Sequence, residues 1–184
     1  MKFTPQSIKD IVLIEPHVHK DERGYFYETF RLNSLEKGVG HKLNFVQDGE
    51  ANSKMGVLRG LHYQTPPFAQ SKLIRVLKGR ILDVVLDIRK SSLSFGQHVA
   101  IEINSSNKNQ LFIPHGFAHG YVVLSDEATI LYKTDNYYSP DFEVGISPND
   151  SQLSIDWQIP FRQLKLSDKD KALPNLADAT FLYN

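Results

Sequence analysis

Cysteine is absent from this chain of 184 residues. Disulfide bonds, thiolate metal sites and cysteine nucleophiles are therefore excluded. An excess charge of either sign is also absent, because 21 basic and 21 acidic residues cancel. A neutral surface has no general attraction for nucleic acid or an anionic membrane, so an anionic ligand has to be held by a few local charges.

Long apolar runs are missing as well. Residues 1–6 lack the apolar core of a signal peptide, and no later run is long enough to cross a bilayer. We therefore expect a cytoplasmic protein with no membrane or nucleic-acid partner. The length suits one domain and no linker or repeat interrupts it, so residues 1–184 are expected to form a single domain.

The chain is instead rich in short strand-like segments. Gly, Pro, Asn, Asp and Ser recur between short apolar or alternating runs, which is typical of an antiparallel sandwich or barrel. Gly79 marks the strongest hairpin signal, because a glycine supplies the positive φ of a tight turn. The predicted strands are 11–14, 25–30, 44–48, 58–64, 71–78, 80–88, 98–103, 110–113, 119–123, 128–134 and 144–146.

Helix signals are weak and confined to two short segments. Residues 32–37 are predicted to form a helix with Asn33 or Ser34 as its N-cap. A second helix is predicted to begin at Ser167 and to stop at Pro174.

His62 follows Arg59 by three residues within the predicted strand 58–64. Burying such groups is costly without a partner or a function. An imidazole can accept and return a proton near neutral pH, and an arginine can hold a phosphate with two hydrogen bonds. Strict alternation puts the two side chains on opposite faces of the strand, so a bulge at Gly60 is needed to bring both to one site.

A second motif, Pro114-x-Gly116-x-x-His119, resembles the second motif of the cupin superfamily, whose members fold as jelly rolls. The first cupin motif supplies His-x-His as metal ligands, but here the chain reads His62-Tyr63-Gln64. Two histidines and a glutamine make a poor divalent site, so no metal is expected. His115 is interpreted as a hydrogen-bonded core or loop histidine.

Further motifs follow one another in the order of one family. They are Asp21-x-Arg23-Gly24, Phe26-x-Glu28, and the segments 56–64, 70–73, 78–89, 114–119, 132–133 and 167–170. This set resembles the dTDP-4-dehydrorhamnose 3,5-epimerase family over nearly the whole chain. The resemblance implies an all-β, cupin-type jelly-roll β-sandwich with short peripheral helices.

The family reaction, as the resemblance implies, inverts C3 and C5 of dTDP-4-dehydro-6-deoxy-D-glucose to give dTDP-4-dehydro-L-rhamnose for dTDP-L-rhamnose biosynthesis. It needs no cofactor, because the C4 ketone acidifies the neighbouring C–H bonds. It does need a base, a stabiliser for the enolate oxygen, and an acid on the opposite face.

The resemblance assigns these roles to four residues: His62 as the base, Asp170 as its orienting carboxylate, Tyr132 as the proton donor and Lys72 as a donor to the enolate oxygen. Each has a structural alternative. Helix capping is the alternative for the aspartates, favoured for Asp168, which rivals Asp170 by type alone. Tyr132 could be a core tyrosine on the inward face of its strand, and Lys72 an edge-strand lysine.

Substrate binding is also implied by the resemblance. Arg23 and Arg59 match diphosphate contacts, and Tyr138 matches a ring that stacks on thymine. In the family, the segment from Arg23 to Glu28 reaches the site of a partner subunit, which implies a homodimer. The full set of substrate-binding residues is Arg23, Phe26, Glu28, Gln47, Arg59, Lys72, His119, Tyr138, Glu143 and Lys169.

The chain departs from the family at Gly49 and Ala51, which replace a usual Asn and Ser. Two polar side chains are thereby lost near the expected sugar or phosphate, although Asn52 could compensate. Three alternatives stay open at this point: an epimerase that inverts only C3 or C5, a metal-dependent cupin, and a sugar-nucleotide binding module without activity.

Overall fold

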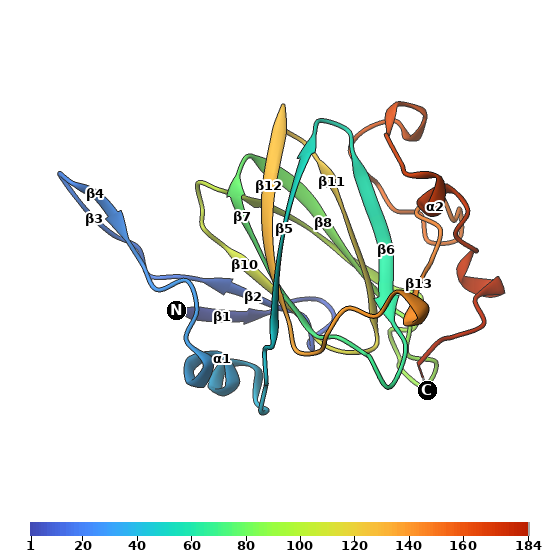
Figure 1. Cartoon of the computed structure of the whole chain (residues 1–184), viewed down its shortest axis with the longest axis horizontal. Helices are drawn as coiled ribbons and strands as arrows, with labels where there is room; N and C mark the ends of the chain where they lie inside the picture. The colour runs from blue at the N-terminus through green and yellow to red at the C-terminus, as the bar shows by residue number, and fades with distance from the viewer. Residues whose placement is uncertain (184) are drawn as a thin grey trace.

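The computed structural model describes residues 1–183, and it is built mainly of antiparallel strands in two facing sheets (Figure 1). The six-stranded sheet has the order β1 (Lys2–Pro5), β2 (Val12–Glu15), β10 (Gln110–Ile113), β7 (Lys72–Lys78), β12 (Glu127–Thr134) and β5 (Gln47–Lys54). The five-stranded sheet has the order β13 (Glu143–Gly145), β6 (Leu58–Gln64), β11 (Phe117–Val123), β8 (Arg80–Asp87) and β9 (His98–Asn104). The predicted cupin-type β-sandwich is confirmed.

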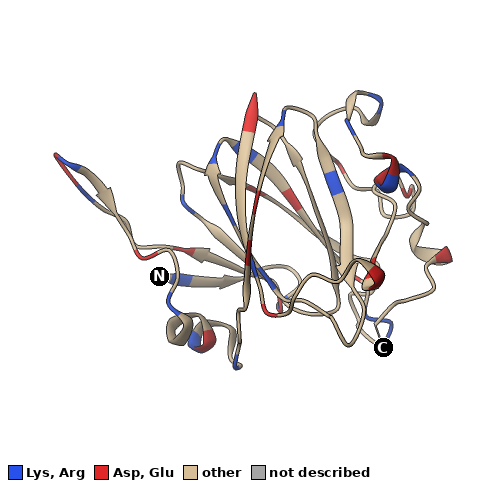
Figure 2. Ribbon diagram, in the orientation of Figure 1, with Lys and Arg blue, Asp and Glu red and all other residues tan. Residues whose placement is uncertain are grey.

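The remaining elements lie at the periphery. A two-stranded hairpin of β3 (His19–Asp21) and β4 (Gly24–Phe26) projects away from the sandwich (Figure 1). The short helices are α1 (Leu32–Val39), α2 (Asp168–Lys171), η1 (Pro140–Phe142), η2 (Phe161–Gln163) and η3 (Leu176–Asp178). No helix within residues 1–183 is long and apolar enough to cross a membrane. Charges of both signs are spread over the ribbon (Figure 2).

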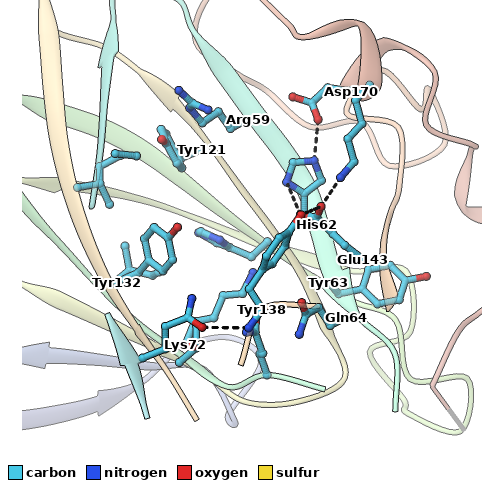
Figure 3. A pocket seen from close by; sticks show the side chains of 18 of the residues that line it. Arg59, His62, Tyr63, Gln64, Lys72, Tyr121, Tyr132, Tyr138, Glu143 and Asp170 are labelled. Carbon is cyan, nitrogen blue, oxygen red and sulfur yellow. Dashed lines mark hydrogen bonds and ion pairs between the residues drawn. The ribbon is translucent and has the colours of Figure 1, made fainter. Parts of the chain in front are cut away.

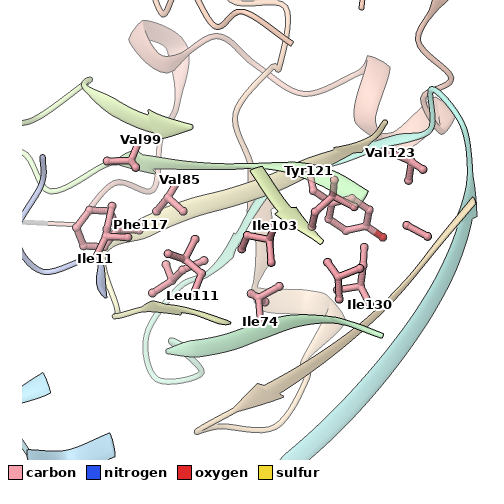
Figure 4. Close-up of a cluster of buried hydrophobic side chains, with 14 of the residues drawn as sticks. Ile11, Ile74, Val85, Val99, Ile103, Leu111, Phe117, Tyr121, Val123 and Ile130 are labelled. Carbon is pink, nitrogen blue, oxygen red and sulfur yellow. The ribbon is translucent and has the colours of Figure 1, made fainter. Parts of the chain in front are cut away.

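Aliphatic and aromatic side chains fill the space between the sheets (Figure 4). Ile74 and Ile130 point inward from one sheet and Val85 and Phe117 from the other. Each such side chain contributes roughly 1.5–3 kcal/mol when fully buried. The interior therefore anchors the strands that also carry the polar side chains described below.

Strand β8 is buried on both faces. Its Ile81 and Val85 point into the interior, whereas Leu82 and Leu86 belong to a second cluster with Trp157. The C-terminal segment thus covers the outer face of the five-stranded sheet. It also brings α2 against β6.

The hairpin predicted at Gly79 is wrong, although the turn itself exists. Gly79 has a φ of 78°, as a tight turn requires. However, β7 and β8 belong to different sheets, so the chain passes from one sheet to the other at this turn. A turn signal is local, whereas the choice of strand partner depends on distant segments.

Three other local predictions are also wrong. The strand predicted at 44–48 is β5, which begins at Gln47 and extends to Lys54. The cap predicted for the first helix is absent, because Arg31 occupies the N-cap position without a side-chain hydrogen bond. The strand predicted at 25–30 is only the short β4, paired with β3.

Candidate active site

A bulge in β6 brings Arg59 and His62 to the same side of the strand, as the sequence predicts. His62 lies opposite His119 on β11, and Arg59 lies opposite Tyr121, so two residues of β6 face one residue of β11 between these pairs. Gly60, at the bulge, has a φ of 120°. Such a conformation is open to glycine and strained for other residues. Both predicted side chains consequently line one cavity.

This cavity has a volume of about 490 Å³ and is lined by both sheets (Figure 3). Its size suits a small ligand held by a few polar groups. Most of the predicted site residues line it, namely Gln47, Arg59, His62, Lys72, His119, Tyr132, Tyr138, Glu143, Lys169 and Asp170.

Asp170 holds His62 from the side of α2. The His62 Nε2 lies 2.6 Å from the Asp170 Oδ1. Ser167 caps the helix by accepting a hydrogen bond from the Asp170 backbone amide at 3.1 Å. Burial opposes ionisation of Asp170, but hydrogen bonds from His62 and Ser167 outweigh it and lower the pKa of the carboxyl. An ionised carboxylate next to an imidazole fixes its tautomer and stabilises its cation.

The capping role therefore belongs to Ser167, and the capping interpretation of Asp168 is wrong. The Asp168 side chain is fully exposed and pairs with Lys171. Asp170, in contrast, is 4% exposed and faces the cavity.

Glu143 flanks the other nitrogen of His62. Its Oε1 lies 3.9 Å from the His62 Nδ1, and its Oε2 accepts hydrogen bonds from Lys169 and from the Tyr138 hydroxyl, the latter at 2.9 Å. Burial opposes ionisation of Glu143, yet the hydrogen bond from Lys169 and the nearby His62 leave its pKa lowered. Three predicted binding residues thus form one polar group beside the predicted base (Figure 3).

His119 has a carboxylate partner that the sequence analysis did not assign. Its Nε2 lies 3.0 Å from the Oδ2 of Asp83, which is fully buried on β8. The signal for Asp83 was present, since this acid stands between Ile81 and Val85 on the same face of the strand. Buried carboxylates need such partners.

Tyr132 and Lys72 lie on the six-stranded sheet, across the cavity from His62 on the five-stranded sheet. Tyr132 lies on β12, on the inward face shared with Ile130, as alternation predicts. Lys72 begins β7, which is paired on both sides, by β10 and β12, so the edge-strand interpretation of this lysine is wrong. Burial lowers the pKa of Lys72, while Glu143 and Asp83 act in the opposite direction.

Gln64 uses its side chain to hold loops in place. Its Nε2 donates to the carbonyl oxygens of Phe68 and Tyr137, and its Oε1 accepts from the Ser139 amide. Within residues 1–183 no three His, Asp or Glu side chains are arranged to hold a metal ion.

Three predicted residues lie outside this cavity. Arg23 is on the projecting hairpin and pairs with Asp21, and Phe26 is 70% exposed at the end of β4. Glu28 follows the hairpin and pairs with Arg31. A large exposed aromatic side chain such as Phe26 is typical of a surface that contacts another molecule.

The structure contradicts the role suggested for Asn52 and confirms the one predicted for His115. Asn52 cannot replace the missing polar groups, because it points away from the cavity and donates to Thr129 on the exposed face. His115 is a loop histidine hydrogen-bonded to Asp135 at 3.0 Å, which confirms the prediction.

Comparisons with known proteins agree with this architecture. A family model described as dTDP-4-dehydrorhamnose 3,5-epimerase matches residues 5–178. A curated relative with that name from Shigella flexneri is 48% identical over 98% of this chain and 99% of its own length. A crystal structure of dTDP-6-deoxy-D-glucose-3,5-epimerase from Legionella pneumophila, in complex with dTDP-4-keto-L-rhamnose, is 44% identical with a TM-score of 0.95, covering 100% of this chain and 97% of that chain.

A more distant structure is also similar. It is a 3'-monoepimerase from Streptomyces bikiniensis in complex with dTDP-quinovose, 34% identical with a TM-score of 0.88, and the match covers 94% of this chain and 87% of that chain. The fold and its relatives together define a cupin-type isomerase. More narrowly, this chain belongs to the dTDP-4-dehydrorhamnose 3,5-epimerase family, whose model spans nearly all of it.

Proposed function

We propose that this chain inverts C3 and C5 of dTDP-4-dehydro-6-deoxy-D-glucose to form dTDP-4-dehydro-L-rhamnose for dTDP-L-rhamnose biosynthesis. The observation that carries the proposal is that His62 and Tyr132 stand on opposite sheets, with the cavity between them. Inversion requires a proton to leave one face of a carbon and another to arrive on the opposite face. A base and an acid on facing walls meet that requirement.

His62 is the proposed base. Because Asp170 holds its Nε2, the Nδ1 is the nitrogen that takes the proton from a carbon next to the C4 ketone. The C–H electron pair moves onto the ketone oxygen and forms an enolate. Asp170 stabilises the imidazolium that results.

Lys72 and Tyr132 complete the step. The Lys72 ammonium stabilises the enolate oxygen, an interaction strengthened by burial. Tyr132 then donates its phenolic proton to the carbon from the opposite face. His62 loses its proton and Tyr132 regains one before the second carbon reacts. The ketone supplies the needed acidity, so the proposal includes no cofactor.

The nucleotide is held by the outer part of the cavity. Arg59 contacts the diphosphate, and its Nε is positioned by a hydrogen bond to the Ser53 Oγ at 3.1 Å. Tyr138, half exposed, stacks on thymine. Gln47, which accepts from the Tyr138 amide, together with His119, Glu143 and Lys169, supplies the remaining polar contacts.

The projecting hairpin supports a homodimer in which Arg23, Phe26 and Glu28 complete the cavity of a partner subunit. In their own subunit these residues do not line the cavity. Mixing His62→Ala and Arg23→Ala proteins tests this arrangement, because a heterodimer would contain one cavity with both native residues. Random pairing would restore about a quarter of the native sites. No restoration after subunit exchange would contradict the crossing of the hairpin.

A second candidate function is inversion of a single carbon. It is favoured by Gly49 and Ala51, which leave the inward face of β5 without two polar side chains, and by the likeness to the 3'-monoepimerase. Incubation with the keto-sugar in D2O separates the two candidates by NMR. Deuterium at C3 and C5 of an inverted product supports double inversion, and deuterium at one carbon supports the alternative. Incorporation at neither carbon would exclude both.

A further inference from the structure

The side-chain amide of Gln64 is hydrogen-bonded to the backbone on both sides of Tyr138. Its Oε1 accepts a hydrogen bond from the Ser139 amide at 2.7 Å, and its Nε2 donates to the Tyr137 carbonyl oxygen at 3.1 Å. The same Nε2 donates to the Phe68 carbonyl oxygen at 2.6 Å. One side chain of β6 therefore holds the two loops 65–71 and 135–142 together, and it grips the second loop at the residues that flank Tyr138.

Gln64 has no donor left for a ligand. A glutamine amide carries two donor hydrogens, and the carbonyl oxygens of Phe68 and Tyr137 use both. Gln64 is only 3% exposed, although it forms part of the cavity wall (Figure 3). Any effect of this side chain on a ligand therefore passes through the loops that it holds.

The end of β6 that carries Gln64 is itself firmly held. Gln64 pairs with Glu143 on β13, and its carbonyl oxygen accepts a hydrogen bond from the Tyr183 hydroxyl at 2.6 Å. A second glutamine holds Tyr138 from the opposite sheet, where the Gln47 Oε1 accepts from the Tyr138 amide at 3.0 Å. A side chain that is fixed at its base in this way makes a rigid support for a neighbouring loop.

The Tyr138 ring depends on this support because packing alone holds it weakly. Tyr138 is 52% exposed, and its hydroxyl donates to Glu143 at 2.9 Å. If its backbone were mobile, a ligand that stacks on the ring would have to order the loop on binding and would lose affinity to conformational entropy. Fixing the backbone on both sides of the ring removes that cost in advance.

We propose that Gln64 is a positioning residue that pre-organises Tyr138 to stack on the base of a nucleotide. This inference rests on the proposed function, in which Tyr138 stacks on thymine. It predicts a loss of affinity that is confined to the base. The diphosphate keeps its contact with Arg59, and proton removal by His62 continues once the cavity is saturated.

The experiment compares the binding of dTDP and of inorganic pyrophosphate by calorimetry. For Gln64→Met, which keeps an unbranched side chain and removes the amide, dTDP affinity is expected to fall by about 5- to 20-fold, within the range for loss of a stacked base. Affinity for pyrophosphate, which has no base, should change by less than about twofold. With the keto-sugar, KM should rise as dTDP affinity falls, while kcat stays within about threefold.

Asn136→Asp is the matched control for a general loosening of the two loops. The Asn136 Nδ2 joins them by donating to the Pro67 carbonyl oxygen at 3.0 Å, and its Oδ1 accepts from the Tyr137 amide at 2.9 Å. The aspartate keeps the acceptor and loses only the bond between the loops. We expect its dTDP affinity to stay within about twofold of wild type.

Two further variants complete the experiment. Gln64→Glu keeps the acceptor for the Ser139 amide but loses both donated bonds, so it should show the same selective loss of dTDP affinity if Gln64→Met does not fold. Adding Gln64→Met to Tyr138→Ala is expected to weaken dTDP binding no further, whereas independent effects would multiply.

Three results would overturn the inference: equal weakening of dTDP and pyrophosphate, wild-type dTDP affinity in the Gln64 variants, or a further loss in the double variant. A different result would identify a failure of the proposed function. If Tyr138→Ala alone binds dTDP as tightly as wild type, the proposed contact with the base is wrong, and the role of Gln64 falls with it.

Discussion

Two histidine–aspartate pairs lie side by side, each with its histidine lining the cavity, and they differ in the strand or helix that supplies the carboxylate. His62 and His119 are cross-strand neighbours. Asp170 reaches His62 from the peripheral helix α2, whereas Asp83 reaches His119 from the adjacent strand β8. The His62 side chain is 23% exposed and the His119 side chain 8%. A carboxylate that arrives from outside the sheet leaves its histidine more open to a ligand, which suits proton transfer. The His119–Asp83 pair, whose two residues lie on adjacent strands of one sheet, suits a fixed binding contact with a ligand.

Truncating each histidine to alanine tests the proposed difference between the two pairs and is expected to give the largest effect. His62→Ala is expected to lower kcat by about 10²–10⁴-fold, the usual contribution of a general base, and to abolish deuterium exchange. His119→Ala is expected to keep exchange and mainly raise KM. Steady-state kinetics measure kcat and KM, and NMR in D2O measures deuterium exchange. Equal loss of exchange in the two variants would contradict the separate roles of His62 as the base and His119 as a binding contact.

Replacing the orienting carboxylate gives the next largest effect. Asp170→Asn keeps the shape of the side chain but cannot stabilise the imidazolium, and its amide can impose the wrong tautomer on His62. We expect kcat to fall by about 10²-fold, with dTDP affinity unchanged within about threefold. A variant with wild-type kcat would show that His62 needs no carboxylate partner.

The same pair predicts a dependence of stability on pH. The pKa of Asp170 is lowered below its ordinary value of 3.8, so the folded state binds this proton more weakly than the unfolded state. Its contribution to the free energy of unfolding is therefore complete above pH 3.8 and is lost as the pH falls through the folded pKa. The difference between wild type and Asp170→Asn should stay constant above about pH 5 and shrink as the pH falls below about 4 in urea titrations. A difference that stays constant in the acidic range as well contradicts the assignment.

Asp83→Asn is expected to have the smallest effect on turnover. Because Asp83 does not contact His62, kcat should fall by less than about tenfold. The free energy of unfolding should fall by about 1–3 kcal/mol, since a fully buried hydrogen-bonded pair is disturbed. Thermal unfolding and kinetics on one preparation measure both, and a loss of turnover like that of Asp170→Asn would make the two pairs equivalent.

Local patterns in the sequence predicted much of the sandwich. Alternation predicted the inward face of Tyr132, and the spacing of Arg59 and His62 required the bulge that occurs at Gly60. These features depend on neighbouring residues, so a single segment carries the information. The roles of the site residues came from motifs that resemble a family, and the structure brings most of them to one cavity.

Several of the errors share one physical cause, which is dependence on distant segments. Strand β5 is largely polar and lacks β-branched residues, so only its pairing with β12 makes it a strand. The turn at Gly79 was predicted, but its strands join different sheets. Asp83 was visible as an acid between Ile81 and Val85, yet its partner His119 lies 36 residues away in sequence.

Tyr132→Phe provides the most direct test of opposed proton transfer across the cavity. Phenylalanine keeps the aromatic ring and removes the hydroxyl group that donates the proton. In D2O, this variant is expected to place deuterium in recovered substrate through His62 while forming little inverted product. Inversion at the wild-type rate, or the loss of exchange together with inversion, would contradict a base on one wall and an acid on the other.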